Sequence, residues 1–572
     1  MIEDVYEPLS RYRNEFKEKF ARIAEEKFDE LTRISGVDVQ ANAVLVSTIK
    51  KLQEQREKLQ NTRTLWALLT TILILLAIAS GVILFLHFSG ETEIPEYLSI
   101  ASVFVIVLAP LICFLKTIPA YRKLDQQIAE LTRQIDSKIA EAWVQMASLN
   151  ALFDWSITSE LIEKTVPRLQ FDRYFTESRL SDLRKNFGWD DSFNEERSVI
   201  HSHSGVINGN PFVFAELRRQ DWHDKIYTGH LPISWVETVR DSDGKLRRVH
   251  RHETLTATVS KPAPYYCNEK VLIFGNEAAP DLTFSRQPSD LSGAENGIWT
   301  SIKRSYRMNK LENFARNLDD DSNFTMMSNR EFELLFHAKD RNDEIAFRLL
   351  FTALAQQEMV DLLKDKQVGF GDDFSFIKDK KINLIIAEHL NDISFDHNPE
   401  QFKNYDYKAI KKYFLQYNKA FFKAAYFALA PLLIVPLYQQ TRTRSNIYGE
   451  TEDDRSAFWE HEALANCYGD SHFEHPDCIT QNILKTRRLR CHADGSSTVR
   501  VTAYGFRGEN RLEMVPAYGG DGRWHNVPVE WVEYLPVKHS STMEIREMFD
   551  PSSSKELPAP QILRRQIWSK LD

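Results

Sequence analysis

The chain has 572 residues, a net charge of −9 at pH 7 and a hydrophobic content of 43%. That length allows several domains with sizeable cores, and the acidic balance argues against a nucleic-acid-binding protein, which usually carries a basic stripe. The 5 cysteines are irregularly spaced, which is typical of a reducing compartment and argues against a disulfide framework. The charged stretch MIEDVYEPLSRYRNEF lacks the apolar segment of a signal peptide, so we expect none there.

In chain order, residues 1–63 come first and are predicted to form cytoplasmic helices. A stripe of apolar residues at helical spacing runs along the first of them. We expect this stripe to pack beside a helical stalk or to cap it; its members are Val5, Leu9, Tyr12, Phe16, Phe20, Ile23, Leu31 and Ile34.

Two uncharged apolar runs follow, residues 65–86 and 97–115, each close to the 20 or so residues that a helix needs to cross a bilayer. Pro110 is expected to kink the second helix, because it removes a backbone donor. The loop between the runs, residues 87–96, carries only acidic charges, whereas lysine and arginine flank both outer ends. The positive-inside rule therefore predicts a multi-pass protein of the bacterial plasma membrane with both termini in the cytoplasm.

Residues 119–153 are predicted to form the helical stalk below this hairpin. Their apolar residues recur every three or four positions, as do those before the first span, so the two segments can pair as antiparallel helices with a coiled-coil seam. Two interpretations stay open: packing within one chain, and assembly of a homo-oligomer through the stalk.

The cytoplasmic body is predicted to be α+β with antiparallel β-rich modules. Residues 165–285 form a β-rich domain, with hairpins around Asn208-Gly209 and Asp243-Gly244 and a further strand at 271–274. A mixed α/β domain, residues 297–440, follows.

Within the mixed domain, Ser328 and Glu331 form a capping-box pattern, and a helix is predicted near residues 344–364. Two short strands surround a turn at 378–381. The apolar run 424–438 is too short to span a bilayer easily, and buried, interfacial and re-entrant placements remain open.

The order of these segments, from GVINGNPFVFAEL through LENFARNLDDDSNFTMMSNREFELLF to VGFGDDFSFIKDKKINLIIAEHLNDISFD, resembles a bacterial family of two-span membrane proteins catalogued only as a domain of unknown function. The resemblance covers residues 165–400. It implies a cytoplasmic β-rich and then α/β body, and it supplies no reaction, cofactor or site residue.

The C-terminal part is predicted to hold a small α+β module, residues 451–549, with a hairpin around Asp494-Gly495. Residues 550–572 are expected to form a linker followed by an amphipathic helix, in which Arg564, Arg565 and Lys570 oppose an apolar face. That helix is expected to dock on the body, or to touch the membrane surface or a partner.

Three groups of residues are candidate chemical sites. The first gathers cysteines and histidines in an order that zinc could use without matching a known signature: Cys467, His472, His475, Cys478, Cys491 and His492. The second holds two histidine pairs whose i, i+2 spacing puts each pair on one strand face, with His223 and His230 between them: His201 with His203, and His250 with His252. The third is Asp319 to Asp321, expected to lie in a loop or at a helix start.

For each group the simpler interpretation is favoured, namely solvated or structural side chains. The sequence contains no phosphate-binding, dinucleotide, nucleophile-elbow or zinc-protease motif. It therefore assigns no catalytic, cofactor-binding or metal-ligating residue.

The resulting expectation is a membrane-anchored scaffold or binding protein with an unidentified protein partner, and not an enzyme. The first alternative is a tethered metal-dependent enzyme that uses the Cys467–His492 cluster. The second is a channel built from hairpins, which the scarcity of polar residues in the two spans disfavours.

Overall fold

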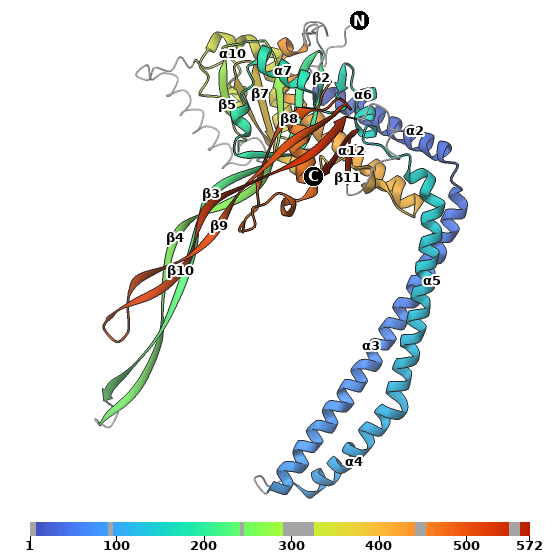
Figure 1. The fold of residues 1–572 in the computed structure, drawn as a ribbon, viewed down its shortest axis with the longest axis vertical. Coiled ribbons are helices and arrows are strands. Elements are labelled where there is room, and N and C mark those ends of the chain that lie inside the picture. The colour runs from blue at the N-terminus through green and yellow to red at the C-terminus, as the bar shows by residue number, and fades with distance from the viewer. Residues whose placement is uncertain are drawn as a thin grey trace. The chain divides into compact units, whose positions relative to one another are not determined.

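The computed structural model describes residues 7–89, 95–240, 245–289, 325–440, 454–547 and 561–571. They fall into two compact units (Figure 1). The body unit comprises Met1–Ile23, Trp155–Asn398 and Asn418–Asp572, and the helical unit comprises Ala24–Asp154 and Pro399–Tyr417.

The helical unit is built from two very long helical stretches. The first is α3 (Val39–Ser89); the second runs through α4 (Glu96–Ile112), a π-helical turn (Cys113–Thr117) and α5 (Ile118–Asn150). The π-helical turn begins three residues after Pro110, which cannot donate a backbone hydrogen bond. In this turn the backbone hydrogen bonds join residues five apart, where an α-helix joins residues four apart.

The predicted pairing of the segments on either side of the apolar hairpin is present. Leu45 and Ile49 of α3 and Ala142 of α5 form one buried cluster, and Arg63 pairs with Asp125 at 2.8 Å. Assembly of several chains through this stalk stays a prediction.

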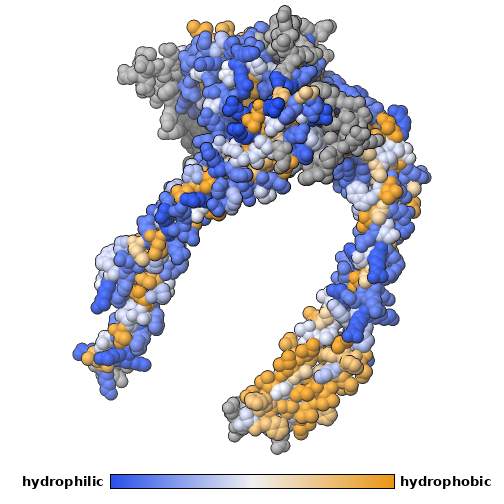
Figure 2. Space-filling view, viewed as in Figure 1, coloured by the Kyte–Doolittle hydropathy of each residue, from blue (hydrophilic) through white to orange (hydrophobic). Residues whose placement is uncertain are grey.

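Two helices are long and apolar enough to cross a membrane, Val39–Ser89 and Tyr97–Asn150. Their apolar side chains face outward, so the described fold provides no core that would account for them. Figure 2 shows these side chains gathered over α3 and α4.

The N-terminal stripe packs differently from the prediction. Its helices, α1 (Pro8–Arg11), a π-helical turn (Tyr12–Phe16) and α2 (Lys17–Ser35), pack against α12 (Tyr407–Leu433). Phe20 stacks on Phe422 with ring centroids 4.3 Å apart, and Phe28 lies 5.3 Å from Phe414. The aromatic rings of α12 thus provide an apolar surface on which the stripe packs.

The apolar run 424–438 is buried within the body unit. Residues 424–435 of α12 and the following chain are all inaccessible to solvent, and Tyr438 of the 3-10 turn Pro436–Gln439 is 1% exposed. The buried interpretation is therefore confirmed.

The first sheet of the body has seven strands in the order β1-β2-β3-β4-β7-β6-β5, all antiparallel. Its strands are β1 (Leu169–Phe171), β2 (Arg197–Ile207), β3 (Asn210–Arg240), β4 (Leu246–Gly275), β5 (Thr283–Arg286), β6 (Phe374–Asp379) and β7 (Ile382–Ala387). The predicted Asn-Gly turn joins β2 to β3, with both residues at positive φ (Asn208 51°, Gly209 80°).

One sheet spans the two domains that the sequence separated. Leu272 of β4 pairs with Ile385 of β7, so the β-rich segment and the mixed segment share a ladder and a core. The predicted helix 344–364 is two helices, α10 (Glu344–Leu350) and α11 (Ala353–Lys364), because Thr352 caps the second. Asn329, rather than Ser328, caps α9 (Arg330–Phe336).

The second sheet has five strands in the order β11-β12-β10-β9-β8. They are β8 (Ile483–Cys491), β9 (Ser496–Tyr518), β10 (Trp524–Glu547), β11 (Gln561–Arg564) and β12 (Ile567–Leu571). The predicted C-terminal amphipathic helix is thus wrong: the segment is a hairpin whose second strand pairs with β10.

Helix α14 (Phe458–Tyr468) packs between the two sheets. Trp459 and Ala463 belong to the apolar core of the first sheet, whereas Leu464 and Ala465 belong to that of the second. The remaining described helices are α6 (Ile157–Thr165), α7 (Glu177–Phe187) and the 3-10 turns Asp191–Asn194, Glu388–Asp392, Pro399–Phe402 and Asp470–His472.

Candidate functional site

The most distinctive feature of the body is an arm made of two long β-ribbons (Figure 1). Beyond Arg219, β3 pairs only with β4, and beyond Tyr504, β9 pairs only with β10. We define the arm as residues 220–240, 246–266, 505–518 and 524–537. Twenty-one residues at the rise of an extended strand give it a length of about 70 Å.

The ribbons are held together through their inner faces. The contact is a buried aliphatic cluster formed by Leu255, Ala257, Val259, Val527 and Val529. At Gly229 the backbones approach so closely that an added Cβ would lie 2.1 Å from the carbonyl oxygen of Pro528. The arm is therefore a thin two-layer structure with its own core. The loop 478–482 contacts it at its base, where the Ile479 N–H donates to the Phe506 carbonyl at 2.9 Å.

Polar contacts fix the register of the two ribbons. Lys261 pairs with Glu513 at 2.7 Å and places its ammonium 4.7 Å from the centre of the Trp531 ring. Nearer the end, the backbone N–H of Gly520 donates to Glu253 at 2.6 Å. These contacts join residues far apart in the sequence, 267 positions for Gly520 and Glu253, and they hold the two hairpins against each other.

The outer faces of the arm expose large apolar side chains. On β9 and β10 these are Leu512, Met514, Tyr518 and Trp524, the last 71% exposed, with the rings of Tyr518 and Trp524 5.4 Å apart. This exposed apolar patch makes the arm a candidate interaction surface.

At the base of the arm lies a cavity of about 480 Å³. Its walls mix apolar groups with two carboxylates and one ammonium: Glu195, Glu196, Gln220, Ile483, Lys485, Tyr504, Gly505, Phe506, Pro536 and Val537. Lys485 donates to the buried carboxylate of Glu462 at 3.2 Å. Burial raises the pKa of Glu462 to about 7, although Lys485 and the Val199 N–H oppose the shift.

The first histidine pair lies in a buried cluster, so the prediction that it occupies a solvated strand face is wrong. Arg564 donates to His201 at 2.9 Å, and Arg565 donates to His203. Arg564 is the last residue of β11 and Arg565 begins the turn to β12, so this hairpin covers that part of β2. The two guanidinium cations contact ring nitrogens of these histidines and would repel a metal cation.

Two further groups complete this cluster. The ring of His397 lies 4.1 Å from that of His203. Glu460 of α14 provides the nearest carboxylate, accepting from Arg565 at 3.4 Å and lying 3.7 Å from Arg564. Burial, then the two arginines, hold the pKa values of His201, His203 and His397 far below the ordinary value for histidine.

The second histidine pair, His250 and His252, lies on the outer face of the arm and is exposed, as the solvated interpretation predicts. His223 is also exposed, and His230 has its Nδ1 3.2 Å from the hydroxyl of Thr256.

The residues of the Cys467–His492 cluster are dispersed over several elements. Cys467 is on α14, Cys478 contacts Asn482 in a loop at 3.6 Å, and His492 has its Nε2 2.7 Å from the Thr498 hydroxyl. In the parts of the chain that the structure describes, no three His, Cys, Asp or Glu side chains form a group that could hold a metal ion. Asp319, Asp320 and Asp321 lie outside the described residues.

A serine–histidine contact near Cys491 is structural. Ser456 lies 3.0 Å from Nε2 of His461 and donates to Glu547 at 2.6 Å, and Arg488 donates to the same carboxylate at 3.1 Å. Because Ser456 is fully buried, its hydroxyl has no access to a substrate. A cavity of about 440 Å³ that includes Cys491 and His492 lies beside this network.

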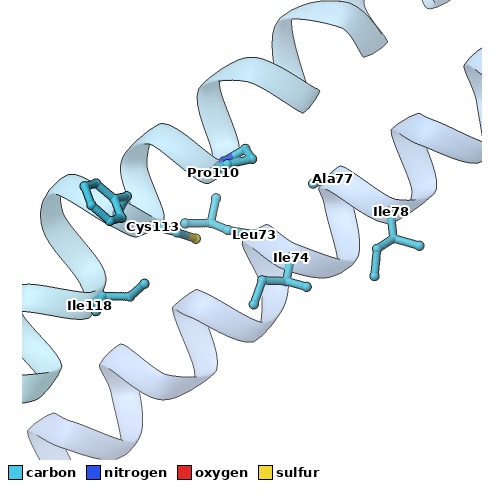
Figure 3. Close-up of a pocket in the computed structure, with 8 residues that line it drawn as sticks. Leu73, Ile74, Ala77, Ile78, Pro110, Cys113 and Ile118 are labelled. Carbon is cyan, nitrogen blue, oxygen red and sulfur yellow. The ribbon is translucent and has the colours of Figure 1, made fainter.

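The apolar hairpin contains a cavity of about 540 Å³ at the kink (Figure 3). Leu73, Ile74, Ala77 and Ile78 of α3 line it together with Pro110, Cys113, Phe114 and Ile118 of the second helical stretch. The lining has no charged group, so its chemistry is that of the hydrocarbon region of a bilayer.

The sequence predicted the hairpin around Asp243-Gly244, whose flanking strands form the longer ribbon, but it predicted neither the second ribbon stacked on it nor the buried arginines. The alternation of apolar and polar residues in the strands was recognisable. No local pattern shows that neighbouring short strands are continuous, as they are in β3 and β4. No family model, curated protein or solved structure matches the chain, so the resemblance stated above remains a prediction.

Proposed function

We propose that the protein is a membrane-anchored binding or scaffold protein whose recognition element is the arm. In this proposal the α3–α4 hairpin inserts into the plasma membrane of a bacterium, and both termini lie in the cytoplasm. The single observation that carries the proposal is the pair of stacked ribbons with exposed apolar side chains on their outer faces.

The anchor is supported by the outward-facing apolar side chains of the hairpin and by its flanks. Arg63 before the first run and Lys116 after the second lie on the side predicted to be cytoplasmic. A hairpin of this kind exposes too few residues on the other side to form a recognition domain, which leaves the body as the working part.

The arm reduces both stability and solubility, and this supports a role in recognition. A two-stranded ribbon is marginal by itself, and its exposed apolar groups reduce solubility. The chain nevertheless stabilises the ribbons with a dedicated aliphatic core and the Lys261–Glu513 pair. A projecting, rigid surface with apolar side chains suits the binding of a partner.

The two alternatives receive less support. The enzyme hypothesis needs a cluster that the described residues do not form. The channel hypothesis needs polar groups free to face a pore, whereas the hydroxyls of Thr70 and Thr71 donate to carbonyls of their own helix, at 2.7 and 3.0 Å, as does that of Ser102 at 2.8 Å.

Site-specific photo-crosslinking in cells tests the proposal. A photoreactive amino acid at Trp524 or Met514 is expected to give one discrete adduct, identified by mass spectrometry. The same amino acid at the exposed Arg487 of β8 is the matched control and should give none. Absence of an adduct from both arm positions, with the protein present in the membrane fraction, would overturn the arm as recognition element. Extraction of the protein by alkaline carbonate would overturn the anchor.

A further inference from the structure

The longer ribbon of the arm extends past the shorter one. Gly520, at the tip of the β9–β10 hairpin, lies against Trp235 and Glu253, and β3 and β4 continue from there to Arg240 and Leu246. Five more residue pairs project the ribbon by about 17 Å. We call residues 236–240 and 245–251 the arm end.

The arm end differs in charge from the rest of the chain. Its described residues include one acid, Glu237, which Arg251 contacts at 3.1 Å. The remaining basic residues form no ion pair within the part of the chain that the structure describes: Arg240, Lys245, Arg247 and Arg248. Even counting Asp241 and Asp243, which lie outside the described residues, the stretch 236–251 carries five basic and three acidic residues, in a chain whose net charge is −9.

The outer face of the ribbon contains no acid over seven consecutive cross-strand pairs. These pairs run from Thr228 with Thr258 to Arg240 with Leu246 and consist of threonine, serine, proline, histidine, valine, leucine and arginine. An electronegative surface can therefore approach this face without repulsion.

Aliphatic side chains alternate with the cations at the arm end. Leu246 is 71% exposed and Val236 is half exposed, and both share the outer face with Arg240 and Arg248. Tyr518 and Trp524 are exposed at the tip of the neighbouring ribbon. Arginine, lysine, aliphatic and amphipathic aromatic groups together are the set that enters the headgroup region of a bilayer.

We infer that the arm end binds an anionic lipid surface. The cations would contact phosphate groups, and Val236 and Leu246 would enter the outer part of the acyl region. The inference rests on the proposed function only in that the anchor keeps the arm near a membrane, which raises its effective concentration there. A lipid surface is favoured over nucleic acid because the chain as a whole is acidic and the basic footprint is short.

Flotation with separate vesicles tests the inference. The full chain is held in nanodiscs of phosphatidylcholine alone, so that its hairpin is already inserted, and is mixed with vesicles of phosphatidylcholine or of phosphatidylcholine with about one-third phosphatidylglycerol. Wild type is expected to float with the anionic vesicles only, and to be released as salt is raised, since screening weakens exposed charge pairs.

Two variants and one control identify the surface. R247E/R248E should reduce flotation at least about tenfold, since each basic group adds to attraction by an anionic leaflet. V236S/L246S keeps the charge and should also reduce it. R487E/R490E makes the same change in net charge at exposed positions on β8 and should float as wild type does.

Three results would overturn the inference. The first is no preference of the wild type for anionic vesicles, and the second is an equal loss of flotation in the arm-end and control variants. The third is arm-end variants that float normally but lose the photo-crosslinked partner; this end would then be a protein-docking surface. Because flotation measures lipid binding and crosslinking measures protein binding, failure of one proposal is distinguishable from failure of the other.

Discussion

The buried histidines predict that the body unit loses stability steeply in mild acid. His201, His203, His397 and His461 all have a pKa in the folded protein below that of an exposed histidine, and for His461 it is about 3. Below pH 6.5 the unfolded chain therefore binds protons that the folded chain excludes. Stability from these groups is present above pH 6.5 and is lost as the pH falls through that value.

The size of the effect follows from counting protons at pH 5.5. Each of the four histidines contributes nearly one proton to the unfolded state, and Glu462, whose pKa is raised to about 7 by burial, binds one proton in the folded state and opposes them. About three protons remain, which corresponds to a loss of about 4 kcal/mol per pH unit. The pKa of Lys378 is lowered to about 7, so its effect is complete before this window begins.

Urea unfolding of the full chain in mild detergent, followed by tryptophan fluorescence, measures this slope. Trp189 and Trp459 are buried in the body core and report on that unit. The double variant H203Q/H397Q should lower the slope by about 2.7 kcal/mol per pH unit, since two titrating groups are removed. The difference between variant and wild type cancels carboxylates such as Glu163 and Glu216, whose pKa values are also raised. A free energy of unfolding that stays constant between pH 6.5 and 5.5, or an unchanged slope in the variant, would refute the reasoning.

Three further predictions concern packing and charge. E460A leaves Arg564 and Arg565 without their shared carboxylate and should destabilise the body by about 3–5 kcal/mol, whereas E195A at an exposed position should change the urea midpoint little. F422A removes the ring that stacks on Phe20 and should cost about 3–5 kcal/mol; a loss below 1 kcal/mol by the same assay would contradict the packing of α12 on the N-terminal helices. G229A places a methyl group against the Pro528 carbonyl and should cost about 1–3 kcal/mol, seen as faster amide exchange in the arm but not in α14; protection equal to that of wild type would contradict the close approach.

Local sequence signals were sufficient to predict an element whose structure depends mainly on residues that are neighbours in the chain. The apolar runs predicted the two long helices, and Asn208-Gly209 and Asp494-Gly495 predicted hairpin turns that are present, because glycine adopts positive φ there without strain. The length of the apolar run 424–438 argued against a membrane span but left buried, interfacial and re-entrant placements open. In each case the decisive residues are neighbours in the chain.

The C-terminal hairpin shows why other elements could not be predicted. Its turn places Arg565 and Gln566 at positive φ (45° and 66°) without a glycine, so the turn has no local signature. Arg564 and Arg565 lie opposite an apolar face when the segment is read as a helix, which predicted a solvated position for them. Burying two arginines is costly without a partner. Their partner, Glu460, lies about 100 residues earlier in the chain and enters through α14.

The arm raises a further problem that any binding hypothesis must address, because each ribbon exposes two unpaired strand edges. Edges of this length promote pairing with other chains. Every strand of the arm contains proline, which cannot donate a ladder hydrogen bond: Pro232, Pro262, Pro264, Pro516, Pro528 and Pro536. A partner that added a strand along the full length of any of these edges would meet a missing donor. Recognition by the arm is therefore expected to use side chains on its faces, where the apolar patch of the shorter ribbon and the cations of the arm end are found.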